Sequence, residues 1–167
     1  MKTTGLFTAL FLATIIPFSA QAQKGERSFG PRVGYVTKND GILAGLTFQY
    51  SFSNHFRLAP EIDVVFRNND LDALTIYVNT HYPISFASDK AAFYPVAGIN
   101  FSSWSRHNVN NPASDDVTSH TNCFGVDAGA GIEYKCSNSL KINFEAVYTL
   151  IKHFPNAKVS VGINYVF

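Results

Sequence analysis

The sequence has little net charge, few charged residues and almost no cysteine. Its 167 residues include 13 Lys and Arg against 12 Asp and Glu, which gives a formal charge of +1. General nucleic-acid-binding proteins carry a marked excess of positive charge, so this balance excludes that class and nucleic acid as a partner. With 46% hydrophobic and 15% charged residues, the composition is that of one folded domain and not of a disordered or collagen-like chain.

Long apolar runs are also missing after the first 22 residues. No window of eighteen apolar residues follows Ala22, so no transmembrane helix is predicted there. The segment before it has the features of a signal peptide: the positive Lys2, the nearly uncharged stretch Gly5–Phe18 and a small-x-small end at Ala22. At ~1.5 Å per residue this stretch covers about 21 Å, less than a ~30 Å hydrocarbon core. We therefore expect residues 1–22 to be removed after Ala22, leaving an exported domain of residues 23–167.

The remaining chain has a strict alternation of apolar and polar residues. In the last ten residues, Val159, Val161 and Ile163 alternate with Ser160, Gly162 and Asn164, a period of two that indicates a β-strand. The same test predicts eight strands: Phe29–Thr37, Gly41–Phe52, Phe56–Phe66, Leu74–Ile84, Phe93–Trp104, Phe124–Tyr134, Ser139–Leu150 and Lys158–Phe167. Turn-forming Asn, Asp, Ser and Gly separate them, and the longest connection is Arg106–Asn122.

One face of these strands is polar and close to charge-balanced. Its titratable members are Arg32, Arg57, Glu61, Asp63, His81, Asp127, Glu133, Lys141, Glu145 and Lys158. Eight strands enclose a space that side chains just fill. We therefore expect this face to point inward and to form a paired polar network, with no open pore.

The other face is apolar, and its aromatic residues gather near the strand ends. Tyr82 and Tyr134 lie towards the short turns, while Phe101, Trp104 and Phe124 lie towards the longer connections. Two aromatic belts are typical of a barrel that crosses a membrane. The predicted fold is therefore all-β: a closed, eight-stranded, antiparallel, up-and-down transmembrane β-barrel. A soluble, secreted or periplasmic carrier of the lipocalin type, with its apolar face inward, is the alternative.

Prolines within the predicted strands count against a closed barrel. A proline removes a ladder N–H group, and Pro31, Pro60, Pro83 and Pro95 all fall in strands. Each lies towards the short-turn end, where the ladder ends or a bulge absorbs the loss.

With these features the chain resembles the small outer-membrane β-barrels of the OmpA/OmpX type, and more closely the β-barrel proteins abundant in Bacteroidota. The resemblance covers Phe29–Phe167, and the ending Val159–Phe167 is similar to the signal read by the barrel-assembly machinery. It implies the bacterial outer membrane, periplasmic termini and an external loop at residues 106–122. The implied partners are outer-membrane lipids, the assembly machinery and a surface partner of that loop. It implies no single activity.

No intact catalytic or metal-binding motif emerges. The long connection holds metal-ligating residue types without a recognised spacing, namely His107, Asp115, Asp116, His120 and Cys123. The stretch from His153 to Ala157 is loosely similar to the His-x-Ser-Asn stretch of lipid A deacylases, but Pro155 stands where the nucleophilic Ser would be. We therefore expect no cofactor, no metal and a structural or surface-interaction role. A lipid A-modifying enzyme is the less favoured alternative.

The two cysteines, Cys123 and Cys136, flank one predicted strand. Thirteen residue steps at ~3.3 Å place them about 43 Å apart, whereas a disulfide needs Cα atoms within ~7 Å. We expect Cys123 at the external rim, Cys136 at a periplasmic turn and no bond between them.

Overall fold

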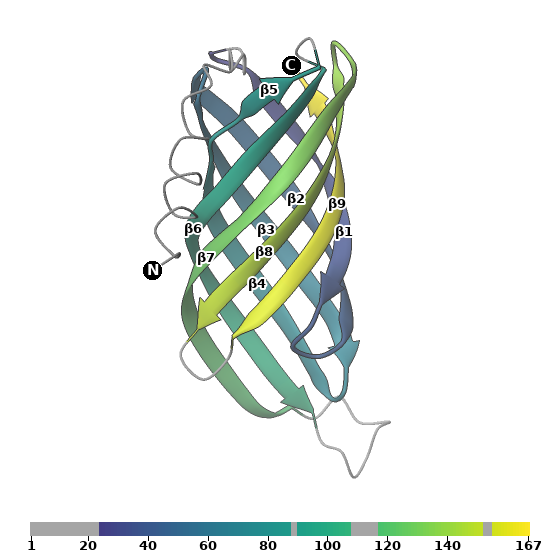
Figure 1. Cartoon of the computed structure of the whole chain (residues 1–167). Coiled ribbons are helices and arrows are strands. Elements are labelled where there is room, and N and C mark those ends of the chain that lie inside the picture. The colour runs from purple at the N-terminus through teal and green to yellow at the C-terminus, as the bar shows by residue number, and fades with distance from the viewer. Residues whose placement is uncertain (1–23, 88–89, 108–116, 152–154) are drawn as a thin grey trace, which may run out of the picture.

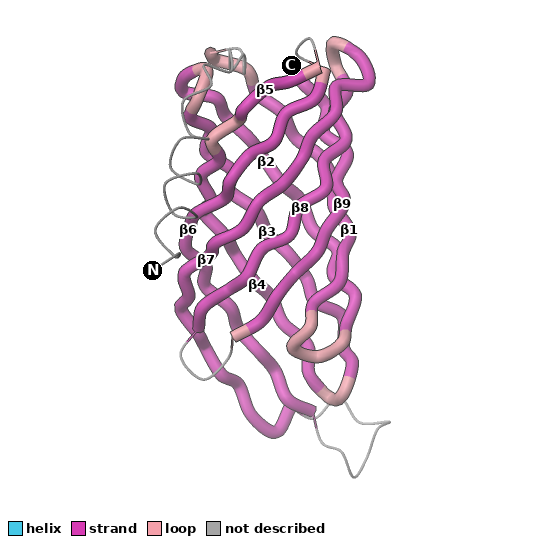
Figure 2. The backbone as a smooth tube through the Cα atoms, viewed as in Figure 1, coloured by secondary structure: helices cyan, strands magenta, loops and turns pink. Residues whose placement is uncertain are grey.

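The computed structural model describes residues 24–87, 90–107, 117–151 and 155–167. Strands account for most of this part of the chain (Figure 2). They are β1 Arg27–Val36, β2 Gly41–Ser53, β3 Phe56–Asn68, β4 Leu71–His81, β5 Ile84–Phe86, β6 Ala91–His107, β7 Val117–Ser137, β8 Leu140–Ile151 and β9 Asn156–Val166. The predicted signal peptide, residues 1–22, lies outside the described residues.

The strands form one closed antiparallel barrel (Figure 1). Consecutive strands pair from β1 to β4 and from β5 to β9, and β1 pairs with β9 to close the wall. The short β5 continues β4 after a break at Tyr82 and Pro83, and both pair with β6. The nine segments therefore fill eight positions in the wall, as expected from the sequence.

The two ends of the barrel differ. The terminal end holds the start of β1, the end of β9 and the connections β2–β3, β5–β6 and β7–β8, while the loop end holds the other connections (Figure 1). At the loop end Asn69 and Asp70 make a two-residue hairpin with positive φ at both positions. Asn and Asp tolerate this conformation better than other non-glycine residues.

Close approach of β1 and β9 at the closing seam requires glycine. A Cβ on Gly30 would overlap the backbone carbonyl of Ile163. The β1–β9 ladder has no pair at Gly30 or Pro31 and resumes in the same register at the pair Arg32 and Gly162, so the interruption at Pro31 is local. Pro60 and Pro95 keep their registers, and Pro83 falls in the break between β4 and β5. The prolines are therefore compatible with closure.

The strands β6 and β7 are longer than the alternation predicts. The sequence indicates a loop from Arg106 to Asn122, but Ser105 pairs with His120 and Arg106 pairs with Ser119. Only residues 108–116 of that loop lie outside the described part. The prediction of a long loop was wrong because a hairpin that projects beyond the membrane has two polar faces, and its sequence then lacks the period of two.

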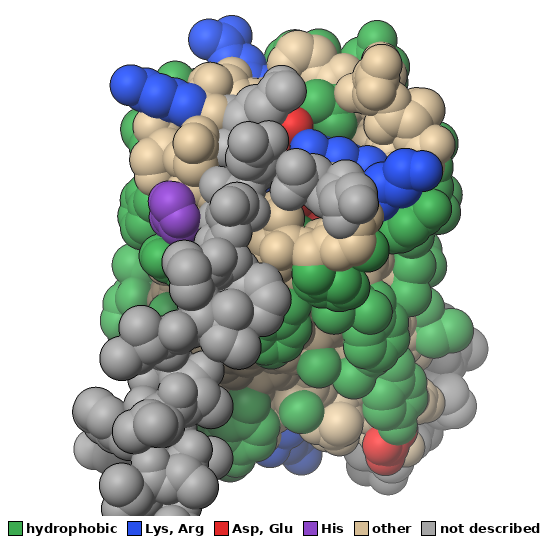
Figure 3. All heavy atoms as spheres, turned by 45° about the horizontal axis from the view of Figure 1, so that its top comes forward, with side chains coloured by type: hydrophobic (Ala, Val, Ile, Leu, Met, Phe, Trp, Pro, Cys, Tyr) green, Lys and Arg blue, Asp and Glu red, His purple; other side chains and the backbone are tan. Residues whose placement is uncertain are grey.

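Apolar side chains cover the outer wall. Phe144 is 45% exposed and Val126 is 50% exposed, whereas their neighbours Asn143 and Asp127 are buried. Green hydrophobic side chains extend over the wall, and Lys and Arg gather at the terminal end (Figure 3). A soluble carrier needs the opposite arrangement, so that alternative is wrong.

Candidate functional site

The barrel interior gathers the titratable side chains of the inner face. None of the ten predicted residues is more than 6% exposed: Arg32, Arg57, Glu61, Asp63, His81, Asp127, Glu133, Lys141, Glu145 and Lys158. Because the wall is a single sheet, a side chain can be buried to this extent only inside it. Eight of them form two ion clusters and His81 lies between these. Asp127 lies apart, nearer the loop end, where it accepts hydrogen bonds from Asn100 Nδ2 at 2.7 Å and Thr149 Oγ1 at 2.6 Å.

The first cluster is centred on the Arg32 guanidinium of β1. It contacts Glu61, lies 3.3 Å from Asp63 Oδ2 and lies 3.8 Å from Glu145 Oε1. Lys158 Nζ approaches the same acids, at 3.0 Å from Glu61 Oε2 and 3.4 Å from Asp63 Oδ2. Two bases thus face three acids contributed by β3 and β8, and every charge has an opposite charge beside it.

The second cluster lies nearer the terminal end. Arg57 Nη1 is 2.6 Å from Glu133 Oε2, and Lys141 Nζ is 3.7 Å from the other oxygen of Glu133. Lys141 also contacts Glu26, just before β1. These pairs join β3, β7 and β8, and the Arg57–Glu133 pair crosses the interior at this level.

Tyr94 links the two clusters and is fully buried. Its ring stacks on His81 with centroids 4.6 Å apart, and Arg57 Cζ lies 4.9 Å from its centroid. Its hydroxyl lies 3.4 Å from Glu145 Oε2, to which it donates, and accepts a hydrogen bond from Asn143 Nδ2. Tyr94 was not among the predicted inner residues. It directly follows the outward Phe93, however, so the alternation places its side chain inside the barrel.

The neighbours of His81 determine which of its ring nitrogens carries the proton. Arg57 Nη2 lies 3.2 Å from His81 Nδ1, and a guanidinium can only donate, so Nδ1 is the acceptor. The proton of the neutral ring is therefore on Nε2, which lies 3.6 Å from Glu145 Oε2.

Glu61, His81 and Glu145 have ligand atoms within 4.8 Å of one another, the one such group among the described residues. Glu61 already contacts Arg32 and Lys158, and two cations at a carboxylate oppose a third. The group fits an ion network better than a metal centre.

An apolar layer occupies the interior at the loop end. Its buried members are Val36, Leu43, Val65, Ala73, Trp104, Cys123 and Ile151. The expectation that Trp104 belongs to the outer aromatic belt was wrong. It follows Phe101 by three residues, an odd number, so the two side chains lie on opposite faces. Cys123 is likewise inside the barrel, where the sequence analysis expected it at the rim.

The β1–β2 turn closes over this layer. Asn39 is 1% exposed, and its Nδ2 donates to the carbonyls of Phe66 and Leu71, both at 3.0 Å. Asn69 Nδ2 donates in turn to the Asn39 carbonyl. These bonds tie two turns together across the mouth at the loop end.

The metal-ligating residue types of the long connection do not converge where they are described. His107 contacts Asp72, and His120 Nδ1 lies 3.2 Å from Ser105 Oγ. His120 is exposed and Cys123 is inside, so they lie on opposite faces of β7. Asp115, Asp116 and His153 lie outside the described residues.

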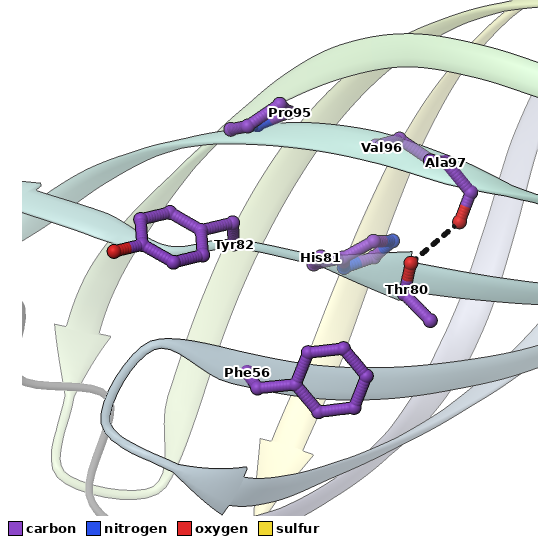
Figure 4. A pocket seen from close by; sticks show the side chains of 7 residues that line it. All are labelled: Phe56, Thr80, His81, Tyr82, Pro95, Val96 and Ala97. Carbon is purple, nitrogen blue, oxygen red and sulfur yellow. Dashed lines mark hydrogen bonds between the residues drawn. The ribbon is translucent and has the colours of Figure 1, made fainter. Parts of the chain in front are cut away.

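A shallow hollow on the outer wall lies where β4 breaks. Phe56, Tyr82 and Pro95 border it, and Thr80 Oγ1 donates to the Ala97 carbonyl at 2.7 Å (Figure 4). Its other lining residues, His81 and Val96, are buried in the barrel. Its exposed surface is almost wholly apolar, so it offers little for the recognition of a polar ligand.

A sequence profile identifies the family of this chain. The profile of the outer membrane protein beta-barrel domain matches residues 9–167. The chain belongs to this family. The protein is therefore an integral β-barrel of the bacterial outer membrane. No curated protein matches the sequence. Among the described residues, no helix is long and apolar enough to cross a membrane.

Solved structures share the fold at low sequence identity. The N-terminal β-barrel domain of Pseudomonas aeruginosa OprF is 12% identical with a TM-score of 0.72, over 86% of this chain and 98% of that chain. Neisserial surface protein A is 15% identical with a TM-score of 0.63, over 85% and 96%. Ail, the attachment invasion locus protein of Yersinia pestis, is 14% identical with a TM-score of 0.61, over 86% and 99%.

Proposed function

We propose that this barrel has a structural or surface-interaction role, is not an enzyme, and holds a filled interior in place of an open pore. Residues 1–22 act as a cleaved signal peptide, and the final strand β9 is the segment read by the barrel-assembly machinery. Outer-membrane lipids surround the wall. The terminal end faces the periplasm and the loop end faces outward.

The observation that carries the filled interior is the ion pairing across it. Arg57 on β3 meets Glu133 on β7, and Lys158 on β9 meets Glu61 on β3. Neither pair joins strands that are neighbours in the sheet, so these side chains bridge the interior. Side chains held across the interior in this way leave no wide channel for a solute.

The long β6–β7 hairpin supports a role at the surface. The described ends of β6 and β7 extend farther than the other strands at the loop end (Figure 1) and carry the exposed polar residues Arg106, Ser119 and His120. Among the proteins of similar fold, Ail is named as an attachment invasion locus protein and Neisserial surface protein A as a surface protein. The absence of a hydroxyl at Pro155 supports a role other than acyl transfer.

Labelling of intact cells tests this orientation and exposure. Ser119→Cys should react with a membrane-impermeant maleimide on whole cells, because Ser119 is exposed on the projecting hairpin. The native Cys136, exposed near the β7–β8 turn, is the internal control and should react only after the outer membrane is permeabilised. Labelling of Cys136 but not of residue 119 on intact cells would reverse the orientation and remove the surface role.

A further inference from the structure

The interior is divided along its axis into a charged column and an apolar layer. The layer takes one residue from each of seven strand positions, β1 to β4 and β6 to β8, so it spans nearly the whole cross-section. The eighth position, β9, begins there with the buried Asn156. Beyond the layer, towards the terminal end, most buried inward side chains are polar or charged and include the two ion clusters, with a smaller apolar cluster of Tyr94, Val96 and Val147 among them.

The charged column must contain water. Several buried polar atoms of the column make no hydrogen bond to the described part of the protein, among them Asp63 Oδ1, His81 Nε2 and Glu145 Oε1, although His81 Nε2 lies 3.6 Å from Glu145 Oε2 and Glu145 Oε1 lies 3.8 Å from the Arg32 guanidinium. Each such atom left without any partner costs about 1–3 kcal/mol, and internal water normally satisfies it. Arg32 Nε and Arg57 Nε are in the same situation. Unsatisfied atoms in both clusters indicate hydration along the column.

Among the described residues, polar and charged side chains, and no apolar layer like that of the loop end, lie at the terminal end of the column. Glu26 and Lys135 lie there, with side chains 9% and 28% exposed, and Lys141 contacts Glu26 from inside. Lys and Arg side chains lie beside acidic ones at this end (Figure 3). Ion pairs at a wet rim exchange partners with water, so they do not form a dry seal. The apolar layer is the dry cross-section.

We propose that the apolar layer is the ion barrier of this barrel, and that the column behind it is a narrow, water-filled cation path that this layer keeps shut. Apolar constrictions block ions by excluding water. Cation preference follows from the five buried acids against four buried bases of the inner face. The inference rests on the proposed interior without an open pore, and it identifies which part of that interior blocks ions.

Single-channel conductance in planar lipid bilayers tests the barrier. Trp104→Ser removes the largest side chain of the layer, and Phe101→Ser, three residues away on the lipid face of β6, is the matched control. We expect the refolded Trp104→Ser barrel to conduct KCl about tenfold more, or higher, than the unaltered barrel. In a KCl gradient its reversal potential should favour K⁺. Phe101→Ser should match the unaltered barrel.

A second variant covers a folding failure of the first. Leu43→Asn keeps the branched shape and the number of side-chain heavy atoms in the layer but adds an amide that binds water, so it should also raise conductance. If both variants fold, as heat-modifiable bands show, and conduct no more than Phe101→Ser, the ion clusters are the barrier and the inference is wrong. If the unaltered barrel already conducts as well as Trp104→Ser, the proposed closed interior fails as well.

Discussion

At the scale of single residues, Arg32 is the most connected charge of the interior. Its guanidinium faces Glu61, Asp63 and Glu145. Replacing a whole buried ion pair by apolar groups is often neutral, whereas removing one partner leaves an uncompensated charge and costs ~3–5 kcal/mol. The value of such a residue is therefore visible in single substitutions.

Arg32→Met should lower the free energy of unfolding by about 3–5 kcal/mol, because three acids lose a base. Glu145→Gln should cost less, about 1–3 kcal/mol, since an amide can still accept from Tyr94 and Arg32 keeps two acids. Urea titration of the refolded barrel in detergent or lipid measures both. Equal and negligible effects would mean that the interior charges contribute no pairing energy.

Gly131 makes room for the ring of Tyr94. A Cβ at this position would overlap the Tyr94 ring, and that ring is held between His81 and Arg57. Gly131→Val should therefore destabilise the barrel by about 1–3 kcal/mol through overpacking. Ala128→Val, on the same strand but facing lipid, is the control and should be near neutral in the same urea titration.

At the scale of the strand, β8 has the most regular alternation of the described chain, with every second residue exposed. Phe144→Arg places a charge on the lipid face and should cost ~2–4 kcal/mol if it lies near the bilayer midplane. Asn143→Ser changes an inward residue and should cost far less. The heat-modifiable fraction and the urea midpoint compare them, and equal effects would contradict the assignment of the two faces.

The cysteines report on the length of β7. Both are free thiols, Cys123 buried and Cys136 exposed. We expect a maleimide to modify one thiol rapidly in the folded barrel and two after denaturation, as mass spectrometry would count them. A Cys123–Cys136 disulfide in the folded protein would require β7 to fold back on itself and would contradict the barrel.

How far the sequence predicts the strands depends on whether one face is apolar. Alternation predicts the bounds of β8 and β9 to within two residues, because lipid and interior impose opposite chemistry on successive positions. It fails for the ends of β6 and β7, since a hairpin in water has no apolar face. It also fails to find the apolar layer, because Leu43 and Trp104 are inward residues without polarity and only their phase reveals them.

At the scale of the whole molecule, the barrel is inverted relative to a soluble protein, with its charges inside and its apolar residues outside. The family assignment and the shared fold with OprF, Ail and Neisserial surface protein A agree with this arrangement. The relation to the barrels of Bacteroidota and the signal peptide stay predictions. This arrangement depends on closure of the sheet by β1 and β9, since an open sheet would expose the inner charges to lipid.

Crosslinking the first strand to the last tests that closure most directly. Val33 on β1 and Val161 on β9 are directly opposed and exposed on the lipid face, and opposed Cβ atoms lie about 4.5–5.5 Å apart. With Cys123→Ala and Cys136→Ser in place, the pair Val33→Cys and Val161→Cys should form a disulfide under mild oxidation and shift mobility on non-reducing gels. The control pair Val33→Cys and Ile142→Cys joins β1 to the non-adjacent β8 and should not crosslink. No bond at the seam, or equal bonding in the control, would contradict a closed barrel.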